Sequence, residues 1–247
     1  MDDSLYDDPF YYRLLFDGRS HDLPFYQQLA KRCDGPILEL GVGTGRVAFA
    51  LARAGHEVVG VDSSESMLAV LRDRVCDESR EVGERLTSIC GDACAIDVGR
   101  QFPLVLFPFN GMAHLHYEEE RQLLLANVAR HLQPSGRFAF DVTVPDPALL
   151  EGATSTVPWF RHPQTGEVCR CDEAASYDPS TQVLTFTATI RFMEAEREPQ
   201  VMRWSLRQFS NETVGAMLDA AGFELLQHDE SLQDAVGYVA RLRSRRF

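Results

Sequence analysis

Residues 37–68 read ILELGVGTGRVAFALARAGHEVVGVDSSESML, in which a glycine-rich turn and a helical repeat separate two apolar, β-branched runs. Val47, Ala50 and Ala54 recur at helical spacing, and Gly55 follows where a helix end favours a left-handed residue. The order strand, turn, helix, strand predicts a βαβ unit of a parallel sheet.

Strands and helices alternate along much of the chain. Ser63 or Ser64 is the expected N-cap of the second helix, and Ser210 and Gly222 should begin and end the last one, because serine oxygens accept hydrogen bonds from free helical N–H groups and glycine favours helix ends. Residues 134–136 should turn the chain into the fifth strand. We expect strands at 36–40, 57–62, 86–93, 102–109, 137–144, 223–229 and 237–245, and helices at 44–55, 64–75, 117–133 and 211–223.

The segment from residue 145 to 207 has a different sequence pattern, in which apolar and polar residues alternate with period two and YDPST at residues 177–181 signals a turn. It predicts an antiparallel β-rich cap or insert. Its aromatic and arginine side chains either cover a substrate pocket or form a small core with the arginines in solvent. For any single residue we favour the second possibility. They are Trp159, Phe160, Arg161, Arg191, Arg203 and Trp204.

Charge limits the range of partners. The net charge of −13, from 24 basic and 37 acidic side chains, would repel nucleic acid phosphates and acidic membrane surfaces. The acidic start MDDSLYDDPF differs from a secretory signal, and no apolar stretch is long enough to span a membrane. We therefore expect a cytoplasmic protein, monomeric or homodimeric, that binds neither nucleic acid nor membrane.

Six cysteines are too few for a disulfide scaffold in a chain of 247 residues, and we expect thiols, most of them buried. The pairs Cys169 with Cys171 and His114 with His116 are each separated by one residue, whereas zinc ligands more often have two or more between them. We expect no metal site.

The glycine turn ELGVGTGR, residues 39–46, lies between a strand and a helix, where missing side chains let the backbone approach a nucleotide cofactor. A tight turn of purely structural origin is the alternative. Asp62, at the end of the second strand, either accepts both ribose hydroxyls or caps the following helix. Asp92, after the third strand, either binds an adenine amino group or serves its own turn.

Two residues distinguish between adenosine-bearing cofactors. The dinucleotide fingerprint needs a third glycine at position 46, where the chain has Arg46. Glu39, inside an apolar strand, would repel a pyrophosphate but tolerates a cofactor that carries an amine and a sulfonium. This charge favours S-adenosylmethionine.

The runs ILELGVGTGR, VVGVDSSESML, GDAC and HLQPSGRFAFDV, in this order, resemble the class I S-adenosylmethionine-dependent methyltransferases. The resemblance covers residues 35–144 well and residues 223–243 more loosely. It implies a doubly wound, Rossmann-like, seven-stranded α/β sheet. The segment LYDDPFYYRLLFDGRSHDLPFYQQLA is similar to the lid of bacterial small-molecule members. The implied organisation is a helical lid at 1–34, a cofactor-binding core at 35–144, the cap at 145–207, and a C-terminal helix with edge strands at 208–247.

The resemblance also implies roles for individual residues. Gly41 and Gly43 would face the methionine part and Asp62 the ribose, with Met67 and Ala93 on the adenine faces and Asp92 at its edge. Tyr11 and Arg19 would close over the cofactor from the lid, or the lid aromatics simply pack on the domain. The full expected cofactor-binding set is Tyr11, Arg19, Glu39, Gly41, Gly43, Asp62, Ser63, Met67, Asp92, Ala93 and Phe109.

The loop FPFNGMAHLHYEEE, residues 107–120, lacks the Pro-Pro-aromatic motif of enzymes that methylate adenine or glutamine amides. It is similar to the corresponding loop of sugar N,N-dimethyltransferases, with His114 at the matching histidine. We expect methyl transfer to a small molecule, at nitrogen in preference to oxygen, with S-adenosylhomocysteine as product. His114 either accepts or orients a proton or only bonds the loop, and Asn110 either orients the acceptor or ties the loop backbone.

Two other functions are compatible with the sequence. A nicotinamide-dependent oxidoreductase would bind NAD(H) but not S-adenosylhomocysteine. A binding module would keep the S-adenosylmethionine pocket without turnover, and would be unaffected by His114→Ala.

Overall fold

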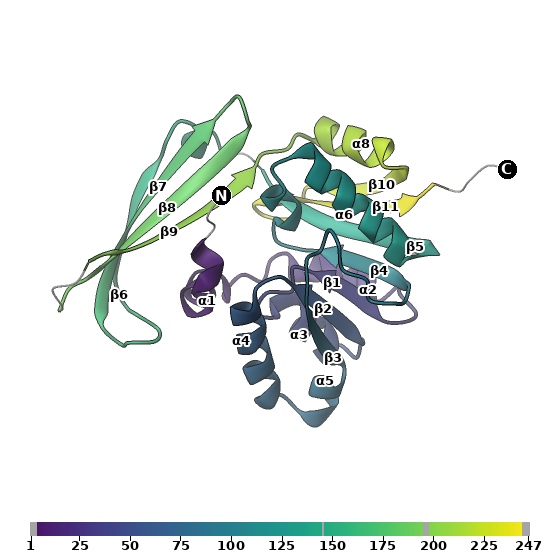
Figure 1. Cartoon of the computed structure of the whole chain (residues 1–247), viewed down its shortest axis with the longest axis horizontal. Helices are drawn as coiled ribbons and strands as arrows, with labels where there is room; N and C mark the ends of the chain where they lie inside the picture. The colour runs from purple at the N-terminus through teal and green to yellow at the C-terminus, as the bar shows by residue number, and fades with distance from the viewer. Residues whose placement is uncertain (1–3, 145, 195–197, 244–247) are drawn as a thin grey trace. The chain divides into compact units, whose positions relative to one another are not determined.

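The computed structural model describes residues 4–144, 146–194 and 198–243. The chain divides into two compact units (Figure 1). The larger unit consists of residues 19–144 and 209–247, and the smaller unit of residues 1–18 and 145–208. Each unit is therefore built from two separate stretches of sequence.

The larger unit contains a seven-stranded sheet in the order β10-β11-β5-β4-β1-β2-β3. Strands β1 to β5 are parallel to one another, whereas β11 is antiparallel to both of its neighbours, β5 and β10. This confirms the predicted doubly wound, Rossmann-like sheet. The strands are β1 (Ile37–Leu40), β2 (Val58–Asp62), β3 (Leu86–Cys90), β4 (Phe102–Phe107), β5 (Leu132–Thr143), β10 (Phe223–Asp229) and β11 (Ala235–Leu242).

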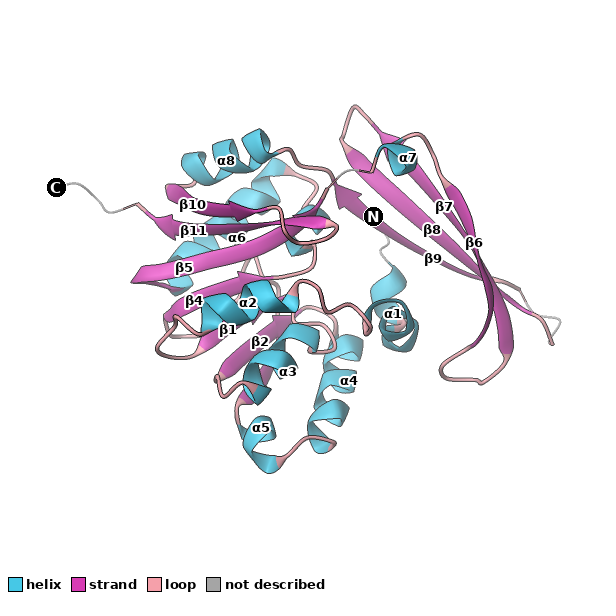
Figure 2. Cartoon of the chain, turned by 180° about the vertical axis from the view of Figure 1, so that it is seen from behind, coloured by secondary structure: helices cyan, strands magenta, loops and turns pink. Residues whose placement is uncertain are grey.

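Helices cover both faces of this sheet. Figure 1 shows α6 and α8 on one face, and Figure 2, seen from behind, shows α2 and α3 on the other. Apolar side chains of the sheet, such as Ile37 and Leu104, are buried between these layers. The helices are α2 (Leu23–Ala30), α3 (Arg46–Arg53), α4 (Glu65–Cys76), α5 (Arg80–Glu84), the 3-10 helix η2 (Gly111–His114), α6 (Glu118–His131) and α8 (Asn211–Ala220).

Helix ends follow the signals in the sequence. Ser64 accepts a hydrogen bond from Met67 N–H at 3.3 Å, and Ser210 accepts one from Thr213 N–H at 3.1 Å. Gly55 follows α3 with a positive φ of 99°. The predicted ends of α3, α4 and α8, which were based on these capping signals, therefore agree with the observed ends to within a few residues.

Some expectations were wrong. Residues 134–136 do not precede the fifth strand: β5 already begins at Leu132, which pairs with Phe102, and the irregularity falls between this pair and Leu104–Arg137. Only Cys169 and Cys171 of the six free cysteines are buried. The short helix α5 was not predicted. Residues 244 and 245 of the expected last strand lie outside the described residues.

The smaller unit holds a four-stranded antiparallel sheet in the order β6-β7-β8-β9, which confirms the β-rich cap. One face is apolar and packs against the N-terminal helices, with Ile190, Trp204 and Tyr11 in its core. Trp159 is 63% exposed, and Arg191 and Arg203 are also exposed. The elements are η1 (Ser4–Asp7), α1 (Pro9–Phe16), α7 (Pro147–Leu150), β6 (Thr154–Arg161), β7 (Val168–Asp178), β8 (Val183–Phe192) and β9 (Gln200–Arg207).

The segment expected as one lid, 1–34, is helical but is shared by both units, because residues 19–34 with α2 belong to the larger one. Its lid function stays a prediction. Among the described residues, no helix is long and apolar enough to cross a membrane, and no three metal-ligating side chains are grouped.

Candidate active site

The candidate site lies at the carboxyl edge of β1, β2 and β4, which are adjacent in the larger sheet. The glycine turn follows β1, Asp62 ends β2, and the loop from Pro108 to Tyr117 follows β4. We call this last segment the acceptor loop. In open α/β sheets ligands bind outside the carboxyl ends of the strands, so these three segments are placed to share one ligand.

The glycine turn has no room for side chains at its centre. Gly41 and Gly43 have positive φ angles of 63° and 54°. A Cβ atom on Gly41 would lie 3.0 Å from Cε2 of Phe107, and one on Gly43 would lie 3.4 Å from Cε of Met67. The turn is thus a backbone cradle bordered by these two side chains.

Asp62 ties the end of β2 to this cradle. Its Oδ2 accepts the Gly43 N–H at 2.7 Å, and its Oδ1 accepts the Ser64 N–H at 2.9 Å. Burial raises the pKa of Asp62, while the N–H donors of Ser64 and Gly43 and the charge of His114 counteract the rise.

Glu39 is a buried carboxyl group, 2% exposed, in the middle of β1. Burial raises its pKa to about 8, although the charge of Arg46 acts in the opposite direction. Among the described residues, no donor lies within hydrogen-bond distance of its Oε2. Because a buried oxygen without a partner is unfavourable, the site is suited to a cationic or N–H-bearing ligand group.

A network of ion pairs joins α2 to the glycine turn. Arg46 donates two hydrogen bonds of 2.6 Å to the fully buried Asp22, and Arg19 donates bonds of 2.5 and 2.9 Å to Asp234. Burial alone would raise the pKa of Asp22, but Arg46 and Arg19 outweigh it and leave that pKa below its usual value. The guanidinium carbons of Arg19 and Arg46 lie 4.8 and 5.5 Å from the centre of the Phe109 ring.

The acceptor loop begins with two strained residues. Phe109 and Asn110 have φ angles of 54° and 63°, which residues other than glycine rarely adopt. The Phe109 N–H donates to Asp141 Oδ1 at 2.6 Å, and Asn110 Oδ1 accepts the Thr143 N–H at 2.6 Å. Asn110 is 6% exposed, and its bond to Thr143 ties the loop to β5, while a role in orienting the acceptor stays a prediction.

The remaining expected residues are distributed as follows. Met67 is buried beside the cradle, whereas Ser63 and Asp92 are exposed and Ala93 is half-buried. Asp92 Oδ1 accepts the Cys94 N–H at 2.8 Å, which stabilises its own turn. Tyr11 belongs to the smaller unit, where its hydroxyl donates to Cys171 Sγ at 3.2 Å. The cofactor-binding roles of these residues stay predictions.

Sequence reasoning did not find Asp22, Asp141, Asp234 and Arg121. Asp141 had a usable signal, since it is an acid inside the apolar run FAFDV, as Glu39 is inside ILEL. Arg46 was noticed only as the residue that breaks the dinucleotide fingerprint. No local pattern links Arg19 to Asp234, which is 215 positions away, and the bonds of Arg121 to the Leu115 and His116 carbonyls depend on how the loop folds back on its helix.

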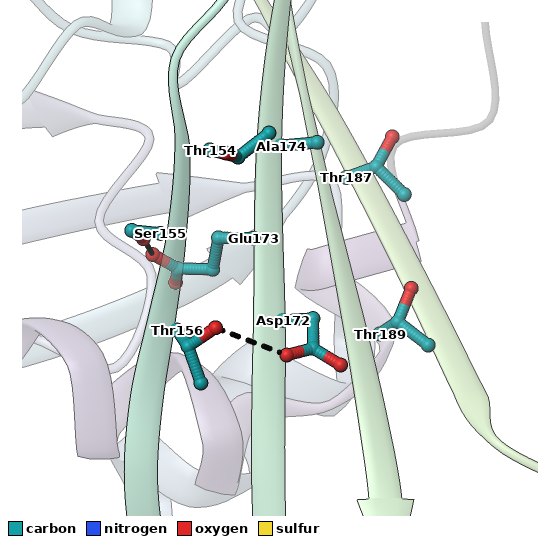
Figure 3. Close-up of a pocket in the computed structure, with 8 residues that line it drawn as sticks. All are labelled: Thr154, Ser155, Thr156, Asp172, Glu173, Ala174, Thr187 and Thr189. Atoms are coloured by element: carbon teal, nitrogen blue, oxygen red, sulfur yellow. Dashed lines mark hydrogen bonds between the residues drawn. The ribbon is translucent and has the colours of Figure 1, made fainter.

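A different hollow, of about 380 Å³, lies on the polar face of the smaller sheet (Figure 3). Asp172 accepts a hydrogen bond from Thr156 at 3.2 Å, and Glu173 accepts one from Ser155 at 3.0 Å. Its carboxylates are thus engaged within the sheet. Threonine hydroxyls make up much of the remaining lining, and nothing there favours methyl transfer.

Comparisons with known proteins match the same segments. The family described as Methyltransferase domain matches residues 37–136, which include the glycine turn, Asp62 and the acceptor loop. Residues 37–136 are therefore similar to a methyltransferase domain. The match confirms the resemblance predicted from the motifs.

Individual relatives extend this result. The cypemycin N-terminal methyltransferase of a Streptomyces species is 37% identical over 117 residues, which are 47% of this chain and 44% of that protein. The chain thus matches less than half the length of this relative. The CcbJ methyltransferase of Streptomyces caelestis is 26% identical, with a TM-score of 0.75 over 92% of this chain and 97% of that one. The S-adenosylmethionine-bound amino pentose methyltransferase CalS10 of Micromonospora echinaspora shares the fold, with a TM-score of 0.72, 20% identity and coverage of 93% and 95%.

The site is compatible with S-adenosylmethionine, the ligand in the CalS10 structure, in three respects. The cradle at Gly41 and Gly43 presents backbone without side chains. Asp62 provides a carboxylate at the end of β2, and the unpartnered Oε2 of Glu39 suits a positively charged group. A dinucleotide pyrophosphate would instead meet the carboxylate of Asp62 with like charge.

Proposed function

We propose that the chain transfers the methyl group of S-adenosylmethionine to a nitrogen of a small-molecule acceptor, with His114 as the residue that accepts or orients the acceptor proton. The observation that carries the proposal is the placement of three segments: the acceptor loop with His114 follows β4, and the glycine turn and Asp62 stand at the ends of β1 and β2, which are adjacent to β4 and to each other in the order β4-β1-β2. A candidate proton acceptor and the cofactor carboxylate thus belong to one site.

When bound, the cofactor supplies an electrophilic methyl group on a sulfonium. The chain's own residues then have three tasks. Asp62 would accept hydrogen bonds from the ribose hydroxyls, Glu39 would balance positive charge, and Gly41 with Gly43 would leave space for the methionine part. In-line displacement needs little covalent help, so holding the nucleophile in position supplies much of the acceleration.

His114 addresses the acceptor. An amine that reacts as a nucleophile must lose a proton, and histidine is the side chain whose charge changes most readily near neutral pH. His114 is the last residue of η2 and is half-buried, so its ring has limited contact with solvent. Asn110, bonded to Thr143, supports the loop and need not touch the acceptor.

The choice of nitrogen is supported by the relative that is 37% identical, whose name specifies an N-terminal amine as its methylation site. The acidic surroundings of the cradle are consistent with it. Asp62 ends β2 at this edge, and the chain carries a net charge of −13. Both would attract a protonated amine before it loses its proton.

The test measures release of S-adenosylhomocysteine with three probe amines: glycine, glucosamine and a tripeptide with a free N-terminus. Matched compounds without the amine are glycolate, glucose and the N-acetylated tripeptide. We expect turnover with at least one amine and none with its matched compound. Thermal midpoints should rise with S-adenosylhomocysteine and not with NAD, because only a bound ligand stabilises by mass action.

His114→Gln should lower kcat by about 10²-fold or more, the usual contribution of a general base. Calorimetry should show its affinity for S-adenosylhomocysteine within about twofold of the unmodified protein, since the cradle is intact. His116→Gln is the matched control and should retain turnover. Full activity of His114→Gln, or turnover of the hydroxyl compounds in preference to the amines, would refute the proposal.

A further inference from the structure

The acceptor loop is fastened to the fold at both ends, and His114 lies between the fastenings. At its start, the Phe109 N–H is held by Asp141, which is fully buried on β5 and also accepts the Tyr26 hydroxyl. Asn110 holds the Thr143 N–H in the same region. A backbone with two left-handed residues in succession persists only where its surroundings fix it.

At its other end the loop is held by Arg121, on the first turn of α6. Its Nη1 donates to the carbonyl oxygens of Leu115 at 2.7 Å and His116 at 2.9 Å. Arg121 is 8% exposed, and its guanidinium carbon lies 5.7 Å from the centre of the Phe209 ring. Charge-assisted bonds with little exposure to water are strong, so this fastening is rigid.

Between the two ends, the loop is packed against the strand that precedes it. A Cβ atom on Gly111 would lie 2.3 Å from Cε2 of Phe107, so only glycine fits there. The Ala113 N–H bonds to the Asn110 carbonyl at 2.8 Å, and the Leu115 N–H to the Met112 carbonyl at 3.2 Å. The backbone that carries His114 therefore has few ways to move.

We propose that Arg121 and Asp141 are positioning residues for methyl transfer: they hold the two ends of the acceptor loop and thereby fix the place of His114. This inference rests on the proposed function, in which His114 acts on the acceptor. Neither residue need touch acceptor or cofactor. A displacement of the reacting groups of about 1 Å can reduce a rate by about 10²-fold, so such fastenings have catalytic consequences.

The main variant is Arg121→Met, which keeps much of the side-chain length and removes the donors. Arg121→Lys keeps one charged donor and is the conservative variant. Arg207→Met is the matched control, because Arg207 Nη1 donates to the Thr181 carbonyl at 2.7 Å in the smaller unit. For the other end, Asp141→Asn keeps an oxygen for the Phe109 N–H, and Asp141→Ala removes it.

Hydrogen exchange of the peptide covering residues 109–117 is the first readout. We expect exchange at least about tenfold faster in Arg121→Met, partial recovery in Arg121→Lys, and no change in Arg207→Met. Asp141→Asn should exchange like the unmodified protein and Asp141→Ala faster. Because Asp141 is fully buried and its alanine variant can fail to fold, the Arg121 series decides the outcome.

Kinetics supply the second readout, with whichever of glycine, glucosamine and the tripeptide is turned over fastest. In Arg121→Met we expect kcat to fall by about 10- to 100-fold while S-adenosylhomocysteine affinity stays within about twofold, because the loop moves and the cradle does not. Unchanged loop exchange in Arg121→Met overturns the inference. So does faster exchange with kcat equal to that of Arg207→Met.

Failure of the proposed function would be recognised separately. If none of the three amines is turned over by the unmodified protein, exchange is compared with and without S-adenosylhomocysteine. Slower loop exchange on binding in the unmodified protein, lost in Arg121→Met, supports the fastening. Equal exchange in the two proteins overturns it.

Discussion

The glycine turn and the acceptor loop follow neighbouring strands, yet they reach left-handed backbone with different residues. After β1 the left-handed positions include Gly41 and Gly43, whereas after β4 they are Phe109 and Asn110. Glycine adopts this conformation without steric cost, while each of the other two costs on the order of 1–3 kcal/mol. The turn requires residues without side chains. The loop instead carries side chains, and hydrogen bonds hold its strained backbone in place.

The buried acids next to these two segments differ in the same way. One oxygen of each acid, Oε2 of Glu39 and Oδ2 of Asp141, has no hydrogen-bond partner among the described residues, but Oδ1 of Asp141 accepts both the Phe109 N–H and the Tyr26 hydroxyl. Burial raises the pKa of both carboxyl groups, and the donors counteract the rise at Asp141. Ionisation of Glu39 should therefore be the more costly.

The largest expected effect is on the pH dependence of stability. The folded pKa of Glu39, about 8, lies above the ordinary value of 4.5. The folded state then binds the proton more tightly, so its stabilisation is complete below the unfolded pKa and is lost as the pH rises to about 8. Without cofactor, the free energy of unfolding should fall by about 3 kcal/mol between about pH 5 and pH 8.5, on the scale of 1.36 kcal/mol per pKa unit.

Urea denaturation across this range measures the effect. Glu39→Gln should show a much flatter profile, while Asp141→Asn should change the slope less. Equal slopes for the two variants would remove the distinction drawn between these acids.

The next effect concerns the close packing around Gly41 in the turn. Gly41→Ala introduces a Cβ 3.0 Å from Phe107 at a positive φ of 63°. We expect affinity for S-adenosylhomocysteine, measured by calorimetry, to fall by about thirtyfold, equivalent to roughly 2 kcal/mol of strain and lost contact.

Gly55→Ala is the matched control for this substitution. Gly55 also has a positive φ, 99°, but apart from its chain neighbours no heavy atom would lie within 4 Å of a Cβ atom placed there. The substitution should lower the thermal midpoint without changing affinity. Similar losses of affinity in both variants would mean that general destabilisation explains the result.

The smallest effect should come from replacing the strained residue Asn110 of the acceptor loop by glycine. Asn110→Gly relieves the left-handed conformation but removes the acceptor of the Thr143 N–H, a loss of about 1–3 kcal/mol. We expect a net destabilisation of about 1 kcal/mol in chemical denaturation. Gln182→Gly, at a φ of 57° in the hairpin between β7 and β8, should be neutral or slightly stabilising. Stabilisation by Asn110→Gly would show that the hydrogen bond between Asn110 and the Thr143 N–H contributes little to the free energy of unfolding.

The sequence predicted features that depend on local signals. The glycine turn, the serine caps of α4 and α8 and the period-two strands of the cap are each encoded within a few residues, and all are present. The exception at residues 134–136 arose because pairing of Leu132 with Phe102 extends β5 beyond the apparent turn. Tertiary pairing there prevailed over local turn propensity.

The site was predictable where residues share a motif and hidden where they meet through the fold. Asp62 is recognisable because it ends a strand after the glycine turn. Arg19 and Asp234 are 215 positions apart, and their ion pair depends on where the last strands return to the sheet. Arg121 resembled one more charged residue of an amphipathic helix until its bonds to Leu115 and His116 were visible.

Because each unit is built from two separate stretches of sequence, the order of these stretches affects how the chain folds during synthesis on the ribosome. The α1 segment emerges early, but the sheet whose apolar face receives it ends at Arg207. In the larger unit β5 waits for its partner β11, which begins only at Ala235. Neither core can therefore close while the nascent chain is short, and both complete late in translation. Premature termination near residue 220 would release a chain with β5 unprotected along one side, a substrate for chaperones or proteases.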